Sequence, residues 1–174
     1  MLKRRSLIVV LALAAPATMQ AAEAHGPGHA MSGGKMGDAR KATRVIEVVA
    51  TDNAFSLKSL EVKDGETVRF VVRNDGLDPH ELLIGTRAEH AEHLKMMRDM
   101  MEAQKKPGGQ PGPAGHAGHA MATPMMQHGS GVMVAPGKTE SFVWTFARTP
   151  DLEFACDIPG HYEDGMRGPI AFVR

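Results

Sequence analysis

Runs rich in Val, Ile and Phe recur in two parts of the chain, residues 44–85 and 132–174, and they predict β-strands. The first part holds RVIEVVATD and SLEVKDGETVRFVVRNDG, and the second of these runs carries a turn at Asp64–Gly65. The later part holds GVMVAPGKTESFVWTFA, DLEFAC and GPIAFVR, with turn signals at Pro136–Gly137 and Thr149–Pro150. This spacing predicts a small all-β domain whose strands are arranged as in a sandwich.

The segment between these two parts has a different amino-acid composition. RAEHAEHLKMMRDMMEAQKK, from Arg87, contains no Gly or Pro and consists mostly of good helix formers, so it predicts one helix. PGGQPGPAGHAGHAMATPMMQHGSG follows, and it is too long for a simple connection. We therefore expect a helix-plus-loop insertion at about residues 87–131.

The N-terminus has the pattern of a secretory signal peptide. Lys3, Arg4 and Arg5 precede the apolar run LIVVLALAA, and small residues lead to a cleavage site after Ala24. An uncleaved anchor is the alternative, but the run is shorter than the roughly 20 apolar residues that span a membrane. We predict a signal peptide over 1–24, export to the periplasm, a flexible Gly-, His- and Met-rich tail over 25–43, and one domain over 44–174.

Charge and cysteine content narrow the function further. The charges nearly balance, with a small acidic excess after signal removal, so neither nucleic acid nor an anionic membrane surface is an evident partner. The chain has a single cysteine, Cys156, so no disulfide can form within it. In an oxidising compartment that cysteine is buried, bound to a metal, or paired with another molecule.

The surroundings of Cys156 favour the metal. His161 and Met166 follow on the same loop, which Pro159–Gly160 keeps from forming regular structure, so three side chains can surround one ion. A thiolate, two imidazoles and a distant thioether are the ligands of blue-copper sites. His80, just after a proline at the end of a strand-like run, can supply the second imidazole.

Cys156 has three other interpretations. Structural zinc prefers a closed set of Cys and His ligands, and a methionine argues against it. A nucleophilic cysteine needs an orienting group and an oxyanion site, and the sequence indicates neither. An inert, buried cysteine with surface His and Met side chains is the remaining alternative.

PHELLIG, together with the C-terminal CDIPGHYEDGMRGPIAFV, resembles the cupredoxins, the family of plastocyanin, azurin, pseudoazurin and rusticyanin. The resemblance implies a Greek-key β-sandwich with one type 1 copper, and the four-residue gaps around His161 are similar to those of longer-loop members such as rusticyanin. The copper ligands that it implies are His80, Cys156, His161 and Met166.

Two residues depart from the family pattern. Cupredoxins usually have a neutral residue after the first histidine, and often Ser or Thr after the cysteine, whereas here these positions hold Glu81 and Asp157. If the two segments lie side by side, two carboxylates approach each other near the copper. One pKa is then expected to rise, because two neighbouring carboxylates do not both ionise easily.

The sequence predicts no enzyme. Multicopper oxidases and two-domain nitrite reductases commonly link their copper centres through a histidine next to the cysteine, but Cys156 lies between Ala155 and Asp157. A single domain with one copper can carry an electron or hold a metal.

Further His and Met side chains lie outside the predicted strands. On the predicted helix they share an arc with Leu94, and core packing and copper binding are both open for that face. Thioether and imidazole groups suit Cu(I) and Cu(II). The candidate accessory ligands are His25, His29, Met31, Met36, His90, His93, Met97, Met101, His116, His119, Met121, Met125, Met126 and His128.

Taken whole, the chain resembles the periplasmic copper-tolerance cupredoxins of the CopI type. That resemblance implies copper binding and detoxification, with copper received from a copper-exporting ATPase. A small electron carrier with a redox partner in a respiratory chain is the alternative, and a chaperone that delivers copper to an apoenzyme is a third.

Overall fold

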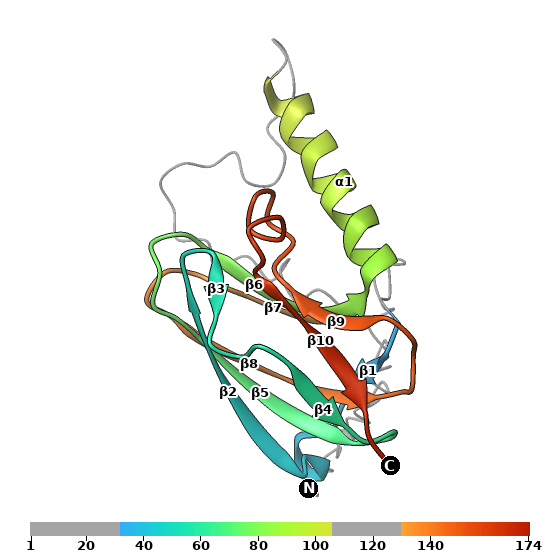
Figure 1. Cartoon of the computed structure of the whole chain (residues 1–174). Coiled ribbons are helices and arrows are strands. Elements are labelled where there is room, and N and C mark those ends of the chain that lie inside the picture. Colours follow the sequence, from blue (N-terminus) through green and yellow to red (C-terminus); the bar gives the residue numbers. More distant parts are fainter. Residues whose placement is uncertain (1–31, 106–129) are drawn as a thin grey trace, which may run out of the picture.

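A computed structural model describes residues 32–105 and 130–174, which form two packed β-sheets and one long helix (Figure 1). The all-β sandwich predicted from the sequence is confirmed. The first sheet has the order β1 (Gly34–Met36), β8 (Thr139–Phe146), β5 (Thr67–Asn74), β2 (Arg44–Thr51) and β3 (Ala54–Phe55). The second has the order β4 (Leu60–Val62), β10 (Arg167–Phe172), β9 (Leu152–Ala155), β6 (His80–Thr86) and β7 (Gly131–Val134).

Strand β5 shows how the sequence encodes a half-buried sheet. Val68, Phe70 and Val72 are buried, whereas Arg69 and Arg73 between them are exposed. This period of two places one face of the strand on the core and the other in solvent. Strand β6 differs, because every residue from His80 to Gly85 is buried.

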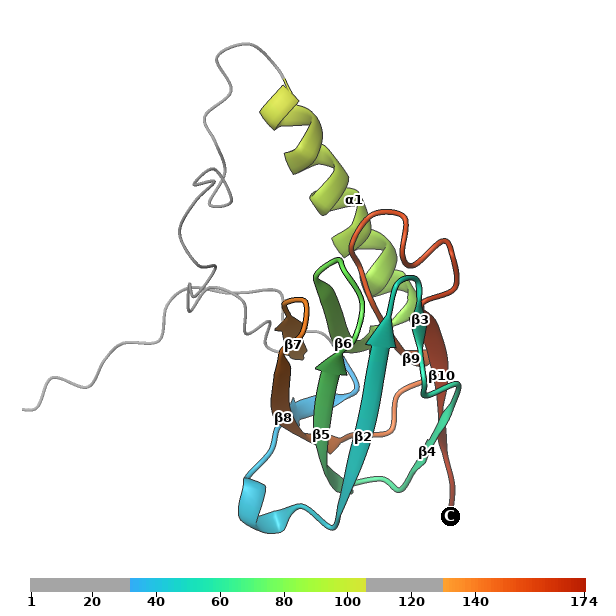
Figure 2. The same cartoon turned by 90° about the vertical axis from the view of Figure 1, so that its left-hand side faces the viewer.

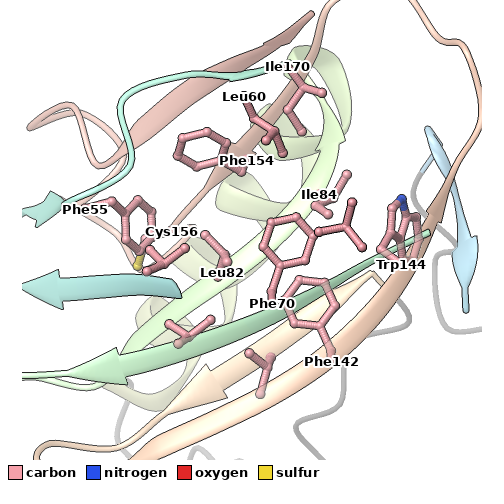
Figure 3. Close-up of a cluster of buried hydrophobic side chains, with 14 of the residues drawn as sticks. Phe55, Leu60, Phe70, Leu82, Ile84, Phe142, Trp144, Phe154, Cys156 and Ile170 are labelled. Atoms are coloured by element: carbon pink, nitrogen blue, oxygen red, sulfur yellow. The ribbon is translucent and has the colours of Figure 1, made fainter. Parts of the chain in front are cut away.

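The core lies between the two sheets and includes the cysteine (Figure 3). Phe70 stacks on Phe142 with ring centroids 4.9 Å apart and meets Phe146 edge-on. Cys156 and Met166 belong to the same cluster and are fully buried. The loop that starts at Cys156 is therefore anchored in the core at both of its ends.

The turns predicted at Asp64–Gly65 and Pro136–Gly137 are present, and each connects strands of different sheets. Gly65 and Gly137 have φ of 77° and 69°, a conformation that glycine adopts without strain. The strands flanking each turn, β4 and β5 or β7 and β8, belong to different sheets. Both turns thus carry the chain across the sandwich.

The prediction of a flexible tail is wrong for residues 32–43. This segment contains β1, which pairs with β8, and a short 3-10 helix, η1 (Ala39–Lys41). The carbonyl of Gly33 accepts a hydrogen bond from Trp144 Nε1 at 3.1 Å. A Cβ on Gly34 would lie 2.1 Å from the carbonyl oxygen of Thr145, so this glycine allows close packing of the backbone.

Helix α1 (Arg87–Lys105) begins at the predicted residue because a capping box fixes its start. The Glu89 carboxylate accepts hydrogen bonds from the backbone N–H and the hydroxyl of Thr86, at 2.7 and 2.8 Å. The Thr86 hydroxyl accepts one from the Glu89 N–H at 3.3 Å. The backbone N–H and the hydroxyl of Ser32 also donate to Glu89, so the N-terminal segment is tied to the helix.

The helix packs on the sandwich only along its first half. Leu94 is buried and Met97 half-buried, whereas Met100 and Met101 are 44% and 46% exposed. In both views the helix projects beyond the end of the sandwich (Figures 1 and 2). Its Leu and Met arc thus serves core packing near the sandwich and faces solvent farther along. Within the two described ranges, no helix is long and apolar enough to cross a membrane.

Candidate metal centre

Two neighbouring strands bring the first histidine and the cysteine to one end of the sandwich. His80 opens β6 and Cys156 directly follows β9. These strands are antiparallel, and their register pairs Leu83 with Ala155, so His80 and Cys156 lie at the same end of the sheet. The loop after Cys156 then returns His161 toward both of them.

The three side chains converge as a set of metal ligands. One ligand atom each from His80, Cys156 and His161 lies within 4.8 Å of the other two. The sulfur of Cys156 is 3.5 Å from His161 Nδ1, and the centroids of the two imidazole rings are 5.0 Å apart. Two imidazoles and one thiol in this arrangement fit a type 1 copper site.

His80 gives the clearest sign that a ligand belongs here. Its side chain is fully buried, and among the described residues neither ring nitrogen has a hydrogen-bond partner. The nearest carboxylate oxygen, on Asp52, is 3.8 Å from Nε2, which is too far for a hydrogen bond. A buried polar group without a partner costs free energy, and a metal ion would remove that cost.

Met166 lies beside the same group through the backbone of the loop. Its N–H donates to the carbonyl of His161 at 2.9 Å, and its carbonyl accepts from the N–H of Cys156 at 3.0 Å. Gly165, which precedes it, has a φ of 96° and so allows the sharp return of the chain. The fully buried methionine is thus fixed against both residues.

Burial controls the protonation of the cysteine and of the histidine. It raises the pKa of Cys156 to about 12, against smaller opposing effects of the backbone N–H groups of Glu81 and Ile158. Without a metal the thiol therefore stays protonated, which disfavours a nucleophilic cysteine. Burial also lowers the pKa of His80, and the neighbouring His161 lowers it further. Neutral imidazole is the form that binds a metal ion.

The expected rise of a carboxylate pKa is wrong for Asp157. His90 Nδ1 lies 2.9 Å from each of its oxygens, and His93 Nδ1 lies 3.0 Å from one of them. Burial alone would raise the pKa of Asp157, but the hydrogen bonds and charges of the two histidines outweigh it and hold the pKa below its ordinary value. Glu81 is also buried, and its backbone N–H donates to the sulfur of Cys156 at 3.4 Å.

The histidines that pair with Asp157 were candidate accessory ligands. His90 is fully buried, and its second ring nitrogen lies 3.4 Å from the carbonyl of Glu153, so both of its nitrogens are engaged. Sequence reasoning missed this pairing. The charged residue next to Cys156, where the family has Ser or Thr, is the signal that could have indicated it, because a buried carboxylate needs cationic or donor partners.

The other candidate accessory ligands are dispersed. Met36 on β1 is 48% exposed and Met101 is exposed on the projecting end of α1, whereas Met97 is half-buried. None of these three belongs to the buried cluster that contains Cys156 and Met166. The following candidates lie outside the described residues: His25, His29, Met31, His116, His119, Met121, Met125, Met126 and His128.

Comparison with known proteins agrees with this geometry. Residues 42–173 match the family described as copper binding proteins, plastocyanin/azurin family. The chain is 42% identical over 171 residues to the copper-resistant cuproprotein CopI of Pseudomonas aeruginosa, with 94% of this chain and 92% of that protein covered. It is 37% identical over 183 residues to the protein of the same name from Rubrivivax gelatinosus, with 96% and 94% covered.

Solved structures with the same fold are also cupredoxins. Auracyanin B aligns with a TM-score of 0.57 and 18% identity, covering 82% of this chain and 97% of that one. The dithionite-reduced auracyanin of Roseiflexus castenholzii aligns with a TM-score of 0.53 and 20% identity, covering 76% and 99%. At these identities the likeness supports the fold alone.

Proposed function

Since the chain belongs to the plastocyanin/azurin family of copper-binding proteins, we propose that it holds one copper ion on His80, Cys156, His161 and Met166. In this arrangement the two imidazoles and the thiolate hold the ion, and the thioether is the weak axial ligand. Copper bound there would alternate between Cu(I) and Cu(II) with little rearrangement, because the loop is anchored in the core at Cys156 and Met166.

The observation that carries this proposal is the state of His80. Among the described residues, its imidazole is buried with no hydrogen-bond partner on either nitrogen, and its ring centroid is 5.0 Å from that of a second imidazole. This arrangement is costly, and the other buried histidine of the described part, His90, has partners for both nitrogens. Metal binding explains the cost, whereas an inert core does not.

Cys156→Ser tests the site. The copper-loaded protein should show an intense visible absorption from thiolate-to-Cu(II) charge transfer, and the serine variant should lose it while retaining weaker copper binding by the other ligands. Met166→Leu should keep the band but shift the reduction potential, because the axial ligand tunes the ion more than it holds it. A full band in Cys156→Ser would contradict the site.

We propose copper tolerance in the periplasm as the biological role. The relatives that match over nearly the whole chain carry the name copper-resistant cuproprotein, and the N-terminal pattern is that of a signal peptide. On this proposal the chain takes up copper delivered by an exporting ATPase, and it is not an enzyme. The exposed thioethers on α1, together with the His and Met residues of the His- and Met-rich segments, would bind additional copper reversibly.

Methionine-to-leucine substitution tests the additional copper. Met96, Met100 and Met101 are exposed on α1, and leucine keeps their size and helix propensity while removing the sulfur. The triple variant should keep the visible band, bind fewer copper equivalents in equilibrium dialysis, and support less growth at high copper. Chemical denaturation of the copper-free triple variant, which should match the wild type, is the control for effects on packing. Unchanged copper stoichiometry and unchanged tolerance in the triple variant would remove accessory binding on α1 from the proposal.

A respiratory electron carrier is the alternative function. An electron carrier needs the copper site and a docking surface but no accessory ligands. If the chain has this role, a strain that lacks it should show a respiratory defect at low copper. A copper-tolerance protein should leave respiration at low copper normal. Growth and oxygen uptake of a deletion strain therefore separate the two roles.

A further inference from the structure

Two histidines of helix α1 contact the copper-ligand loop at Asp157, the residue that follows its cysteine. Asp157 and His90 are both fully buried, and the His93 side chain is 12% exposed. The Nδ1 atom of each imidazole is hydrogen-bonded to the Asp157 carboxylate, with nitrogen-to-oxygen distances of 2.9 to 3.0 Å. We name Asp157, His90 and His93 the aspartate clamp.

The clamp joins parts of the chain that are 64 and 67 residues apart. Helix α1 belongs to the insertion, and Asp157 belongs to the loop that runs from Cys156 to Met166. Both views show that loop lying alongside α1 (Figures 1 and 2). A buried carboxylate is tolerated only where it is paired, so the helix and the loop hold each other in one relative position.

Asp157 lies between two residues that determine the surroundings of the sulfur. Cys156 precedes it, and Ile158 follows it with a backbone N–H that lowers the pKa of the Cys156 thiol, against the larger effect of burial. The N–H of Glu81 donates to the same sulfur from β6. Fixing the Asp157 side chain therefore fixes the short stretch of backbone between Cys156 and Ile158, beside the sulfur.

We propose that helix α1 positions the cysteine side of the copper site through the aspartate clamp, so that Asp157, His90 and His93 act as positioning residues for copper. Hydrogen bonds to the cysteine sulfur are one of the factors that tune the potential of such sites, and outer partners that orient ligands commonly affect the metal's properties. The insertion then orients the copper site, in addition to any accessory copper that it binds. This inference rests on the copper site proposed above.

The helix contacts the loop at a second point, which provides a control. Arg98 pairs with Glu163, and these side chains are 52% and 43% exposed. An exposed ion pair contributes little to stability, and this one is remote from the sulfur in the sequence of the loop. Removing it should loosen a contact between the same two segments without disturbing the backbone at Asp157.

Substitution of His93 tests the proposal. His93→Leu removes the donor, whereas His93→Asn places an amide nitrogen near the position of Nδ1 and should restore the contact. Hydrogen exchange of the Ile158 amide in the copper-free protein should accelerate by about tenfold in His93→Leu, because local opening becomes easier. In the copper-loaded protein the visible band and the reduction potential should shift. His93→Asn and Arg98→Ala should both stay close to the wild type in all three measurements.

The outcomes separate positioning from mere stability. Equal effects of His93→Leu and Arg98→Ala, equal effects of His93→Leu and His93→Asn, or an unchanged band, potential and exchange rate in a folded His93→Leu protein would each overturn the proposal. If His93→Leu does not fold, Asp157→Asn keeps the shape of the side chain and gives the same three readouts. The exchange measurement needs no copper, so it stands even if the Cys156→Ser experiment contradicts the copper site.

Discussion

Two pairs of histidines in this protein have opposite environments. The ring centroids of His80 and His161 lie 5.0 Å apart beside a cysteine, and the His80 side chain has no hydrogen-bond partner among the described residues. His90 and His93 both contact the Asp157 carboxylate. Burial lowers the pKa of His80, whereas for His90 the hydrogen bond and charge of Asp157 outweigh burial and raise the pKa.

The difference shows that the partner decides what a buried histidine does. An imidazole that is kept neutral and unpartnered is ready to bind a metal ion and makes the copper-free fold less stable. An imidazole that is hydrogen-bonded to a carboxylate is not available to a metal ion, and it holds two segments of the chain together. Substitutions at the two sites should therefore change the free energy of unfolding in opposite directions. Three measurements test this contrast.

The largest effect is expected from Asp157→Ala in the copper-free protein. Removing the carboxylate leaves His90 buried without its main partner, and breaking a buried pair costs about 3 kcal/mol of unfolding free energy. Chemical denaturation of the copper-free variant measures this loss. A loss below about 1 kcal/mol, the range of exposed pairs, would mean that the clamp contributes no more than a surface contact.

A smaller effect of opposite sign is expected from His80→Leu. Leucine replaces an unpartnered buried imidazole with an apolar group of similar size, so the copper-free protein should gain about 1 kcal/mol of unfolding free energy. The same variant should lose the visible copper band. Destabilisation comparable to that of Asp157→Ala would show that His80 has a structural partner and would contradict the contrast between the two pairs.

The smallest effect is a pH dependence that His90 confers on the copper-free protein. Its side chain faces Asp157 and the carbonyl of Glu153, with the Tyr162 ring 6.1 Å away. Because the folded pKa is raised, its stabilisation is complete below the ordinary value of about 6.5 and is lost as the pH rises through the folded value. Unfolding free energies measured from pH 6 upward should therefore decline, and His90→Gln should flatten that decline.

The sequence predicted the β-sandwich because its strands and turns follow local patterns. It also predicted that His80, Cys156 and His161 lie together, and copper binding there stays a prediction. Alternation of Val and Phe with Arg defines β5, and Gly65 and Gly137 mark turns whatever the strands pair with. The spacing of Cys156, His161 and Met166 is likewise local. His80 was a candidate from the proline before it and from the family resemblance, but its proximity to Cys156 depends on the pairing of β6 with β9, which no local pattern shows.

Long-range pairing explains what the sequence did not predict. His90 and His93 stand one helical turn apart, which suits a metal site as well as it suits a shared carboxylate. Their partner lies more than sixty residues later, so no local pattern distinguishes the two roles. The glycines at 33 and 34 were interpreted as flexibility for a similar reason, because the strand that they approach, β8, is more than one hundred residues away.

Strand β1 also has a consequence for how the protein behaves in solution. It pairs with Trp144, Thr145 and Phe146, at the end of β8, and its three residues form the outermost strand of that sheet. An uncovered strand edge offers unpaired N–H and carbonyl groups to other chains and promotes aggregation. A chain trimmed to begin at Arg44 would keep all four proposed copper ligands but leave this edge open. The short segment before the main strands thus covers the edge of β8, and its removal is expected to promote self-association.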